Sequence, residues 1–504
     1  MTEPIRFLLN GAPVEVTGVA PQVTLLQYLR ETRGLTGTKE GCAEGDCGAC
    51  TVVLASSIGE RLDWQPVNAC IRLLPSVDGK AVFTVESLRG ADGTLHPVQQ
   101  AMVAAHASQC GFCTPGFVMS LFALYKEVRA PGREAICDAL SGNLCRCTGY
   151  RPIVAAAATM GEYPAPDDWR GPGIAADGTR VPTPAEAGLV RALASLARTE
   201  TFDYAAAGQR WLAPRTLAAL TSLCAQRPDA RLVAGATDLG LWVTKQHRDL
   251  GDMVYIGEVA ELAALTRRDD GSLFIGAGVS LAQAFAALDT THPELHEAWM
   301  RFASPPIRAS GTLGGNVANG SPIGDSMPAL IALRARVVLA GAAGTRELAL
   351  EDFHVAYQRT ARTPGEVLVG VRIPARPRNL VLRAYKISKR YDQDISAVFA
   401  CFALERDGAR IADARIGCGG VAPVPARARA TEAMLRGQPW RHDTFRAAAA
   451  RLAAEFAPID DLRASAAYRR TVLGNLVERL WLEADGASTA PLRIEDFAVA
   501  MNAP

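Results

Sequence analysis

Eight of the twelve cysteines fall into two groups whose residue type and spacing could hold iron. The first group has the order C-x4-C-x2-C followed by a more distant cysteine, and the second combines CxxC with CxC. Four thiolates are the number that one 2Fe-2S cluster takes, and the order of the first group is typical of such a cluster. The groups consist of Cys42, Cys47, Cys50 and Cys70, and of Cys110, Cys113, Cys145 and Cys147. We therefore predict two 2Fe-2S clusters and a chain that transfers electrons.

The segments around the first group resemble a plant-type β-grasp ferredoxin domain. Residues 5–16 predict two short strands joined by an Asn-Gly turn, and residues 24–32 predict a helix that begins after a threonine N-cap. Residues 82–85 are expected to add a further strand. Only 19 residues separate Cys50 from Cys70, a short spacing that resembles the iron-sulfur domains of molybdenum hydroxylases.

The second group is flanked by two longer motifs. The segments QCGFCTPG, residues 109–116, and GNLCRCTGYRPI, residues 142–153, resemble the two signatures of the all-helical 2Fe-2S domain in the xanthine dehydrogenase family. Pro115 is expected at the start of a helix whose apolar residues recur at helical spacing as far as Val128. The resemblance implies that Gln109 touches the pterin of a molybdenum cofactor.

Structural zinc is the alternative for the second group, because four-cysteine zinc sites are widespread. The flanking motifs and the neighbouring first group favour iron. A disulfide framework is disfavoured in a chain of this size without a secretory leader, and we expect a cytoplasmic protein. The remaining cysteines stand alone in the sequence and are assigned no chemistry: Cys137, Cys224, Cys401 and Cys418.

Two glycine-rich segments further along the chain point to a dinucleotide. Residues 231–240 predict a buried strand, a glycine loop and a helix, and backbone amides in such a loop suit a pyrophosphate. Residues 302–325 resemble the second flavin loop of the same family. An ordinary turn is the alternative for either loop alone, but both in family order favour FAD. The resemblance assigns FAD binding to Gly235, Ala236, Thr237, Asp238, Leu239, Gly240, Phe302, Thr312, Gly315, Asn316, Asp325, Leu368 and Lys386.

Two aromatic residues are candidates for the face on which a nicotinamide stacks. Phe302 matches the family aromatic beside the isoalloxazine ring, and Tyr357 is the second candidate. The alternative is that both are core aromatics. The charged segment 388–395 would lie beside the flavin by the same resemblance and could tune the access of NAD against oxygen, although such a segment is more often only solvated.

Length and composition fit an α+β multidomain enzyme. The chain has 504 residues, of which 49% are hydrophobic, and its net charge is only +1, so nucleic acid is not an expected partner. No apolar stretch approaches the ~20 residues that a membrane helix needs, so a membrane is not an expected partner either. Residues 163–184 are rich in proline and glycine, which indicates a connector. We predict a β-grasp 2Fe-2S domain (1–86), a helical 2Fe-2S domain (87–163), a linker (164–204), an α+β FAD-binding domain (205–380) and a small C-terminal domain (381–504).

The resemblance implies the iron-sulfur and FAD subunit of a split member of the xanthine dehydrogenase family. The 504 residues do not include the molybdenum domain, so we expect hypoxanthine or xanthine to be oxidised on a large partner subunit, in a heterotetramer of two small and two large chains. Electrons would pass through the second and then the first cysteine group to FAD. A flavin is needed there because clusters carry single electrons, whereas NAD accepts a hydride.

Two other functions remain open. One is electron transfer in a sister molybdenum hydroxylase that acts on an aldehyde, carbon monoxide or an aromatic substrate. The other is a zinc-stapled scaffold without redox function, which would be colourless and free of flavin. Fusion of the iron-sulfur and flavin parts in one chain favours xanthine dehydrogenase, because many sister enzymes divide these parts between chains.

Overall fold

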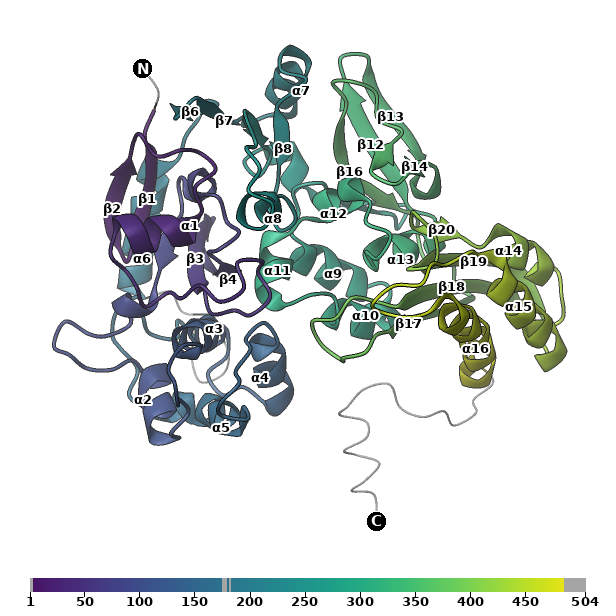
Figure 1. The fold of residues 1–504 in the computed structure, drawn as a ribbon, viewed down its shortest axis with the longest axis horizontal. Helices are drawn as coiled ribbons and strands as arrows, with labels where there is room; N and C mark the ends of the chain where they lie inside the picture. Colours follow the sequence, from purple (N-terminus) through teal and green to yellow (C-terminus); the bar gives the residue numbers. More distant parts are fainter. Residues whose placement is uncertain (1–2, 175–178, 181–182, 485–504) are drawn as a thin grey trace. The chain divides into compact units, whose positions relative to one another are not determined.

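The computed structural model describes residues 3–174, 179–180 and 183–484, which form two compact units (Figure 1). The first unit comprises the described part of residues 1–261 together with 280–282 and 303–312, and the second comprises 262–279, 283–302 and the described residues from 313 onward. Parts of the predicted linker 164–204 and of the predicted C-terminal domain 381–504 lie outside the described residues.

The first unit begins with a five-stranded sheet in the order β2-β1-β5-β3-β4. The predicted hairpin is confirmed, and Asn10 and Gly11 both adopt positive φ in its turn. The predicted helix is confirmed from its N-cap onward, since the Thr24 hydroxyl accepts the Gln27 amide, but the helix continues as a wide π-helical turn. The elements are β1 (Ile5–Leu9), β2 (Ala12–Val16), α1 (Leu25–Gln27), η1 (Tyr28–Thr32), β3 (Thr51–Ile58), β4 (Arg61–Asn68), η2 (Leu74–Val77) and β5 (Ala81–Phe83).

The strand predicted at residues 82–85 is only partly confirmed. Strand β5 ends at Phe83, and Val85 already begins the short 3-10 helix η3 (Val85–Ser87). The strand pairs in parallel with β1 and antiparallel with β3, which places it in the middle of the sheet. The sheet therefore has the mixed pairing of a β-grasp domain.

Four helices follow the sheet: α2 (Pro97–Ala104), α3 (Thr114–Glu127), α4 (Arg133–Leu140) and α5 (Arg151–Thr159), with η4 (Met160–Glu162) after them. The helix predicted at Pro115 is confirmed as α3, which runs through the core of this region. Helix α6 (Pro184–Leu196) begins with a capping box at Thr183. A buried ion pair of 2.6 Å between Lys126 and Glu186 joins α6 to α3.

A second sheet of the first unit has the order β6-β7-β9-β8. Its elements are β6 (Phe202–Ala206), β7 (Gln209–Ala213), α7 (Leu217–Gln226), β8 (Arg231–Val233), α8 (Leu239–Thr244) and β9 (Met253–Tyr255). The strand, loop and helix predicted for residues 231–240 are present, but the prediction of a buried strand is wrong. Strand β8 lies at the sheet edge, so Arg231 and Leu232 are exposed and only Val233 is buried. Helix α11 (Pro305–Ser310) completes the unit.

The second unit contains a five-stranded sheet in the order β10-β11-β16-β12-β13 and a two-stranded hairpin. The strands are β10 (Leu265–Arg267), β11 (Leu273–Gly276), β12 (Arg336–Gly341), β13 (Gly344–Ala349), β14 (His354–Ala356), β15 (Arg359–Thr360) and β16 (Val367–Ile373). The helices are α9 (Leu281–Asp289), whose first two residues belong to the first unit, η6 (Pro293–Leu295), α10 (His296–Met300), α12 (Leu313–Asn319), α13 (Ser326–Ala332) and η7 (Leu350–Asp352).

A four-stranded antiparallel sheet, β17-β18-β19-β20, and three helices end the described chain. The elements are β17 (Leu380–Ile387), β18 (Val398–Asp407), β19 (Arg410–Gly419), β20 (Ala426–Arg427), α14 (Arg429–Leu435), α15 (His442–Glu455) and α16 (Ala466–Ala484). Strands β18 and β19 are long and largely buried, and the helix α16 buries Leu473, Leu476, Val477 and Leu480 on one face. The molecule thus belongs to the predicted α+β multidomain class.

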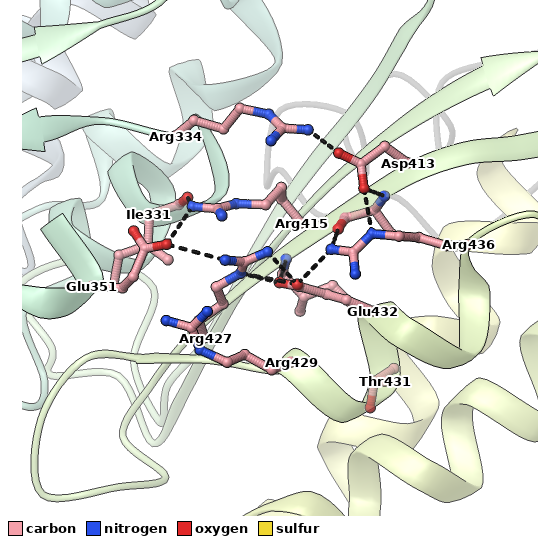
Figure 2. A network of polar contacts seen from close by, with 12 residues as sticks. Ile331, Arg334, Glu351, Asp413, Arg415, Arg427, Arg429, Thr431, Glu432 and Arg436 are labelled. Carbon is pink, nitrogen blue, oxygen red and sulfur yellow. Dashed lines mark hydrogen bonds and ion pairs between the residues drawn. The ribbon is translucent and has the colours of Figure 1, made fainter. Parts of the chain in front are cut away.

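Buried charges join the two sheets of the second unit (Figure 2). Glu351, beside the five-stranded sheet, accepts hydrogen bonds from Arg415 at 2.8 Å and Arg427 at 3.2 Å. Glu432 of α14 is fully buried and pairs with Arg427 at 2.7 Å and Arg436 at 3.1 Å. Removal of one partner would leave a buried charge uncompensated, so this network holds the two sheets together.

Candidate electron-transfer site

The first cysteine group lies in the loop between η1 and β3 and just after β4. Its thiols contact one another in a chain: Cys42 touches Cys47 and Cys70, and Cys50 also touches Cys70. These contacts lower the pKa of Cys42, and the same contacts with Cys42 raise the pKa of Cys47 and Cys70. Thiols this close cannot all ionise unless cations compensate their charge. The iron ions of a 2Fe-2S cluster provide that charge, so the group fits the predicted cofactor.

Backbone and side-chain donors point at the first group. The amides of Asp46 and Cys47 donate to the Cys42 sulfur at 3.4 and 3.3 Å, and the Asn68 side-chain amide lies 3.9 Å from the Cys50 sulfur. Hydrogen bonds to cluster sulfur are one of the factors that set a reduction potential. Asn68 did not figure in the sequence prediction, although it lies only two residues before Cys70.

The second cysteine group lies at the ends of helices. Cys110 and Cys113 precede α3, and Cys145 and Cys147 precede α5. The thiols contact in two pairs, Cys113 with Cys145 and Cys110 with Cys147. Burial and then the contact with Cys145 raise the pKa of Cys113 to about 12.

Pairs of thiols suit two irons better than one zinc. In a 2Fe-2S cluster the four cysteines are shared between two iron ions, whereas a zinc ion needs its ligands around one point. Thr148 adds a donor to the second group, since its amide lies 3.5 Å from the Cys145 sulfur.

The loops of the two cysteine groups are hydrogen-bonded to each other within the first unit. The Leu144 amide donates to the Cys47 carbonyl at 3.0 Å, so ligands of the two predicted clusters are joined through one hydrogen bond and a few covalent bonds. The Asn143 side chain makes a second link, donating to the Gly48 carbonyl at 3.2 Å. The sequence placed these loops in one chain but did not predict that they touch.

The first cysteine loop also contacts the glycine loop of residues 235–240. The Thr244 hydroxyl on α8 donates to the Ala43 carbonyl at 2.6 Å, directly after Cys42. A Cβ atom at Gly240 would lie 2.6 Å from the carbonyl oxygen of Ile71, directly after Cys70. The first loop therefore lies between the second cysteine loop and the glycine loop.

The glycine loop packs closely on helix α11. A Cβ atom at Gly235 would overlap the backbone of Ser310, so only glycine fits at this position. The Thr237 hydroxyl lies beside Gly311, and Ala236 adopts a positive φ of 58°. Asp238 is exposed and Thr312 is buried. This tight, strained loop between β8 and α8 is suited to the predicted phosphate cradle.

In the second unit three further predicted FAD residues, Lys386, Asp325 and Asn316, make polar contacts within the protein. Lys386 pairs with Asp325 at 2.9 Å, and the second Asp325 oxygen accepts the Ser396 hydroxyl at 2.7 Å. Asn316, which follows Gly315, accepts the Ser326 hydroxyl at 2.5 Å. Both oxygens of Asp325 are thus held by the protein, which orients its carboxylate.

The predicted ring-side residues differ in exposure. Leu368 is buried in β16, while Phe302 follows α10 and packs its edge on Phe285 with ring centroids 5.2 Å apart. Tyr357 is 58% exposed in the β14–β15 turn, which speaks against a core role for this residue. Gln109 is exposed beside the second cysteine group.

Sequence reasoning missed Arg301, which holds the charged segment 388–395. Its buried guanidinium donates to the carbonyls of Lys386 and Tyr391, both at 3.2 Å, and stacks 4.6 Å from the Tyr391 ring. It also donates to the Ser388 hydroxyl at 3.1 Å. No signal in the sequence distinguished this arginine from the others, because its partners lie almost 90 residues away. Among the described helices, none is long and apolar enough to cross a membrane.

The chain matches four protein families along its length. They are the 2Fe-2S iron-sulfur cluster binding domain (residues 7–73), the [2Fe-2S] binding domain (84–158), the FAD binding domain in molybdopterin dehydrogenase (202–376) and the CO dehydrogenase flavoprotein C-terminal domain (383–484). Two 2Fe-2S domains and one FAD domain confirm the predicted cofactor classes of this chain.

Similar proteins were found among both sequences and structures. Xanthine dehydrogenase of Drosophila subobscura is 34% identical over 95% of this chain, and that of Arabidopsis thaliana is 33% identical over 88%. The chain spans about two fifths of the length of the curated relatives it matches, 39% and 36% in these two cases. A carbon monoxide dehydrogenase chain from Hydrogenophaga pseudoflava, 28% identical, superposes with a TM-score of 0.51 over 53% of this chain and 94% of that one. Quinoline 2-oxidoreductase from Pseudomonas putida 86, 27% identical, gives 0.50 over 55% and 96%.

Proposed function

Because this chain belongs to the molybdenum hydroxylase family, we propose that it is the iron-sulfur and FAD subunit of a xanthine dehydrogenase. In this function it receives electrons from hypoxanthine or xanthine, oxidised at a molybdenum centre on a partner chain, and passes them to NAD. The relatives named xanthine dehydrogenase support the substrate class. A cytoplasmic location remains a prediction.

The order of contacts in the first unit is the observation that carries the proposal. The first cysteine loop is hydrogen-bonded through Cys47 to the second loop and through Ala43 to helix α8 of the glycine loop. A chain that relays electrons needs its carriers in a line, and this order supports a path from the second group through the first to the flavin. The residues of this chain hold the carriers, and FAD, when bound, converts single electrons into the hydride that NAD takes.

The proposed ligands follow the two units. The eight cysteines of the two groups hold the clusters, and the loop 235–240 with Thr312 binds phosphate. In the second unit we assign Gly315, Asn316 and Asp325 to the rest of the dinucleotide and Leu368, Lys386 and Phe302 to its ring. Arg301 is hydrogen-bonded to Lys386 and to Ser388 and Tyr391 of segment 388–395, so it holds this segment beside Lys386.

The second cysteine group supports the proposed partner. Cys110 and Cys147 are exposed, and three apolar side chains nearby in the sequence are also exposed: Phe112 by 47%, Leu144 by 40% and Tyr150 by 39%. Exposed apolar side chains around a redox centre suit a protein interface. We assign this face to the molybdenum subunit, with Gln109 toward the pterin, in a heterotetramer of two small and two large chains.

The acceptor side of the proposal rests on two aromatics. Tyr357 is exposed in its hairpin and Phe302 is half-buried, so each offers a ring face or edge to a nicotinamide. The electron acceptor in this proposal is NAD.

A sister hydroxylase is the second candidate. The C-terminal family takes its name from CO dehydrogenase, and the similar solved structures act on carbon monoxide or quinoline according to their names. The same relay would serve such an enzyme, because the substrate would be selected on the partner chain.

The test is to purify the chain with its natural partner and to measure NADH formation with xanthine, an aldehyde, carbon monoxide and quinoline in parallel. We expect NADH with xanthine and little with the other three. Turnover confined to one of the other substrates would favour the sister enzyme. A colourless, zinc-containing protein without flavin would refute both.

A further inference from the structure

We propose that Asn143 is a positioning residue that locks the two cysteine loops together for electron transfer between them. The inference rests on the proposed function, because it requires two redox centres in this chain. It concerns the junction at which Cys47 of the first group meets Leu144, the residue before Cys145 of the second group.

The Asn143 side chain uses both ends of its amide in this junction. Its nitrogen donates to the Gly48 carbonyl at 3.2 Å, and its oxygen accepts the Ser120 hydroxyl of α3 at 2.7 Å. Asn143 and Ser120 are each only 2% exposed. A buried amide with both ends satisfied is strongly oriented, because each lost hydrogen bond would leave a buried polar group unpaired. Asn143 therefore fixes α3, the second loop and the first loop in one arrangement.

Glycines allow the backbones to meet at this junction. Gly48 has a φ of 69°, and a Cβ atom there would overlap the Gly142 carbonyl. A Cβ atom at Gly116, near the start of α3, would overlap the Gly48 carbonyl in turn. Three backbone segments thus lie so close together that no side chain fits at Gly48 or Gly116. The Asn143 side chain hydrogen-bonds across this junction, in addition to the backbone hydrogen bond from Leu144 to Cys47.

The hydrogen bond from Leu144 to Cys47 gives this packing a functional consequence. An electron that moves from the centre held by Cys145 to the centre held by Cys47 has a short path through that bond. The transfer oxidises one centre by one electron and reduces the other by one, and no bond is made or broken. Its rate depends on how closely the loops are held, and Asn143 helps to fix that separation together with the Leu144–Cys47 hydrogen bond and the backbone packing.

The test uses the full chain in its native complex and compares Asn143→Ala with Asn68→Ala. Asn68 is an apt control because it is equally buried, at 2% exposure, and also lies beside a cluster ligand, but its contact stays within the first group. Low-temperature EPR of the fully reduced protein measures the magnetic splitting between the two centres, which falls steeply with their distance. Iron, acid-labile sulfide and both individual EPR signals report that each centre is intact.

We expect Asn143→Ala to keep both centres and to reduce the splitting measurably, while Asn68→Ala keeps the wild-type splitting. An unchanged splitting in Asn143→Ala would overturn the proposal. If Asn143→Ala fails to fold or loses a cluster, Ser120→Ala decides: it removes only one of the two hydrogen bonds, and a weakened splitting supports the lock whereas an unchanged one refutes it. Failure of the proposed function is distinct, since the wild-type protein would then lack two interacting centres.

Discussion

The two cysteine groups hold the same number of thiols in opposite surroundings. In the first group Cys50 and Cys70 are buried in a core shared by the β-grasp sheet and the sheet of β6 to β9. In the second group Cys110 and Cys147 are exposed at helix ends. The other two cysteines of each group, Cys42 and Cys47 in the first and Cys113 and Cys145 in the second, are half-buried. The first group is therefore the more enclosed and suits transfer within its own chain, whereas the exposed cysteines of the second group suit transfer to or from another protein. The difference therefore indicates that the second group receives electrons and that the first group relays them.

The different surroundings follow from the elements that carry the cysteines. Cys50 and Cys70 flank β3 and β4, so they take part in a sheet that is covered on its inner face. The second group is carried by turns before α3 and α5, and a turn at a helix end stays at the surface unless another element covers it. The described residues of this chain leave that face open.

Replacement of Cys147 by serine should have the largest effect on electron transfer through this chain. Loss of this exposed ligand removes the entry centre, so substrate-driven NAD reduction in the complex should stop while FAD stays bound. Cys137→Ser is the matched control, because Cys137 is an exposed cysteine of α4 outside both groups. Activity and flavin content measured on both variants decide the matter, and retained turnover in Cys147→Ser would contradict the electron path.

Gly235→Ala tests the proposed step from the first cysteine group to FAD. The added Cβ atom would overlap the Ser310 backbone, so the glycine loop must shift and FAD content should fall to a small fraction of the wild-type value. Gly188→Ala on α6 serves as the control, because its nearest neighbour is an arginine side chain 3.9 Å away. Flavin absorbance after purification measures the effect. Full flavin content in Gly235→Ala would count against this loop as a phosphate site.

Acid should lower the stability of the helical region around the second cysteine group more than that of the β-grasp region around the first. Burial lowers the pKa of His96, the N-cap of α2, to about 4. The unfolded chain binds this proton near pH 6.5 and the folded chain only near pH 4, so stability falls as the pH drops through that interval. The loss between pH 7 and pH 5 should be about 2 kcal/mol.

Urea unfolding of the full chain at the two pH values measures this loss. His96→Asn keeps a capping oxygen and should make the pH dependence less steep, and exposed His106→Asn should leave it unchanged. Buried His292 and His354, whose pKa values burial also lowers to about 4, account for a remaining part. An equally steep pH dependence in His96→Asn would rule out this histidine as the cause.

Asn68→Ala should have the smallest effect, a shift in the reduction potential of the first centre alone. Its amide is a donor to the Cys50 sulfur, and a lost hydrogen bond of about 0.5–1.5 kcal/mol corresponds to roughly 20–65 mV in a one-electron couple. The potential of the first centre should become more negative, because the donor stabilises the added electron. A redox titration followed by EPR should show the second centre unchanged. An equal shift at both centres would mean that the effect is not local.

Local patterns predicted much of the fold. The hairpin at Asn10, the N-cap at Thr24 and the helix at Pro115 depend on neighbouring residues only, and all three are confirmed. The prediction that β8 is buried was wrong, because the burial of a strand depends on its place in the sheet and β8 is an edge strand. Val85 failed as a strand residue for a similar reason, since β5 ends where its pairing with β3 ends.

The candidate site was predictable by residue type but not by contact. The cysteine groups stood out by their spacing, and the loops by their glycines. The links between them join residues far apart in sequence, such as Asn143 with Gly48, or Lys386 with Asp325. Asparagine, lysine and arginine side chains are usually solvated, so only their burial in the fold distinguishes these few as parts of a site.

The most direct test of the central claim is a reductive titration of the full chain, followed by EPR and by analysis of metal, sulfide and flavin. We predict about four iron atoms, about four sulfides and one FAD for each chain, with two distinct 2Fe-2S signals that interact magnetically when both centres are reduced. Two signals without any interaction would contradict the contact between the loops as an electron path, and a protein with zinc and no flavin would contradict the whole account.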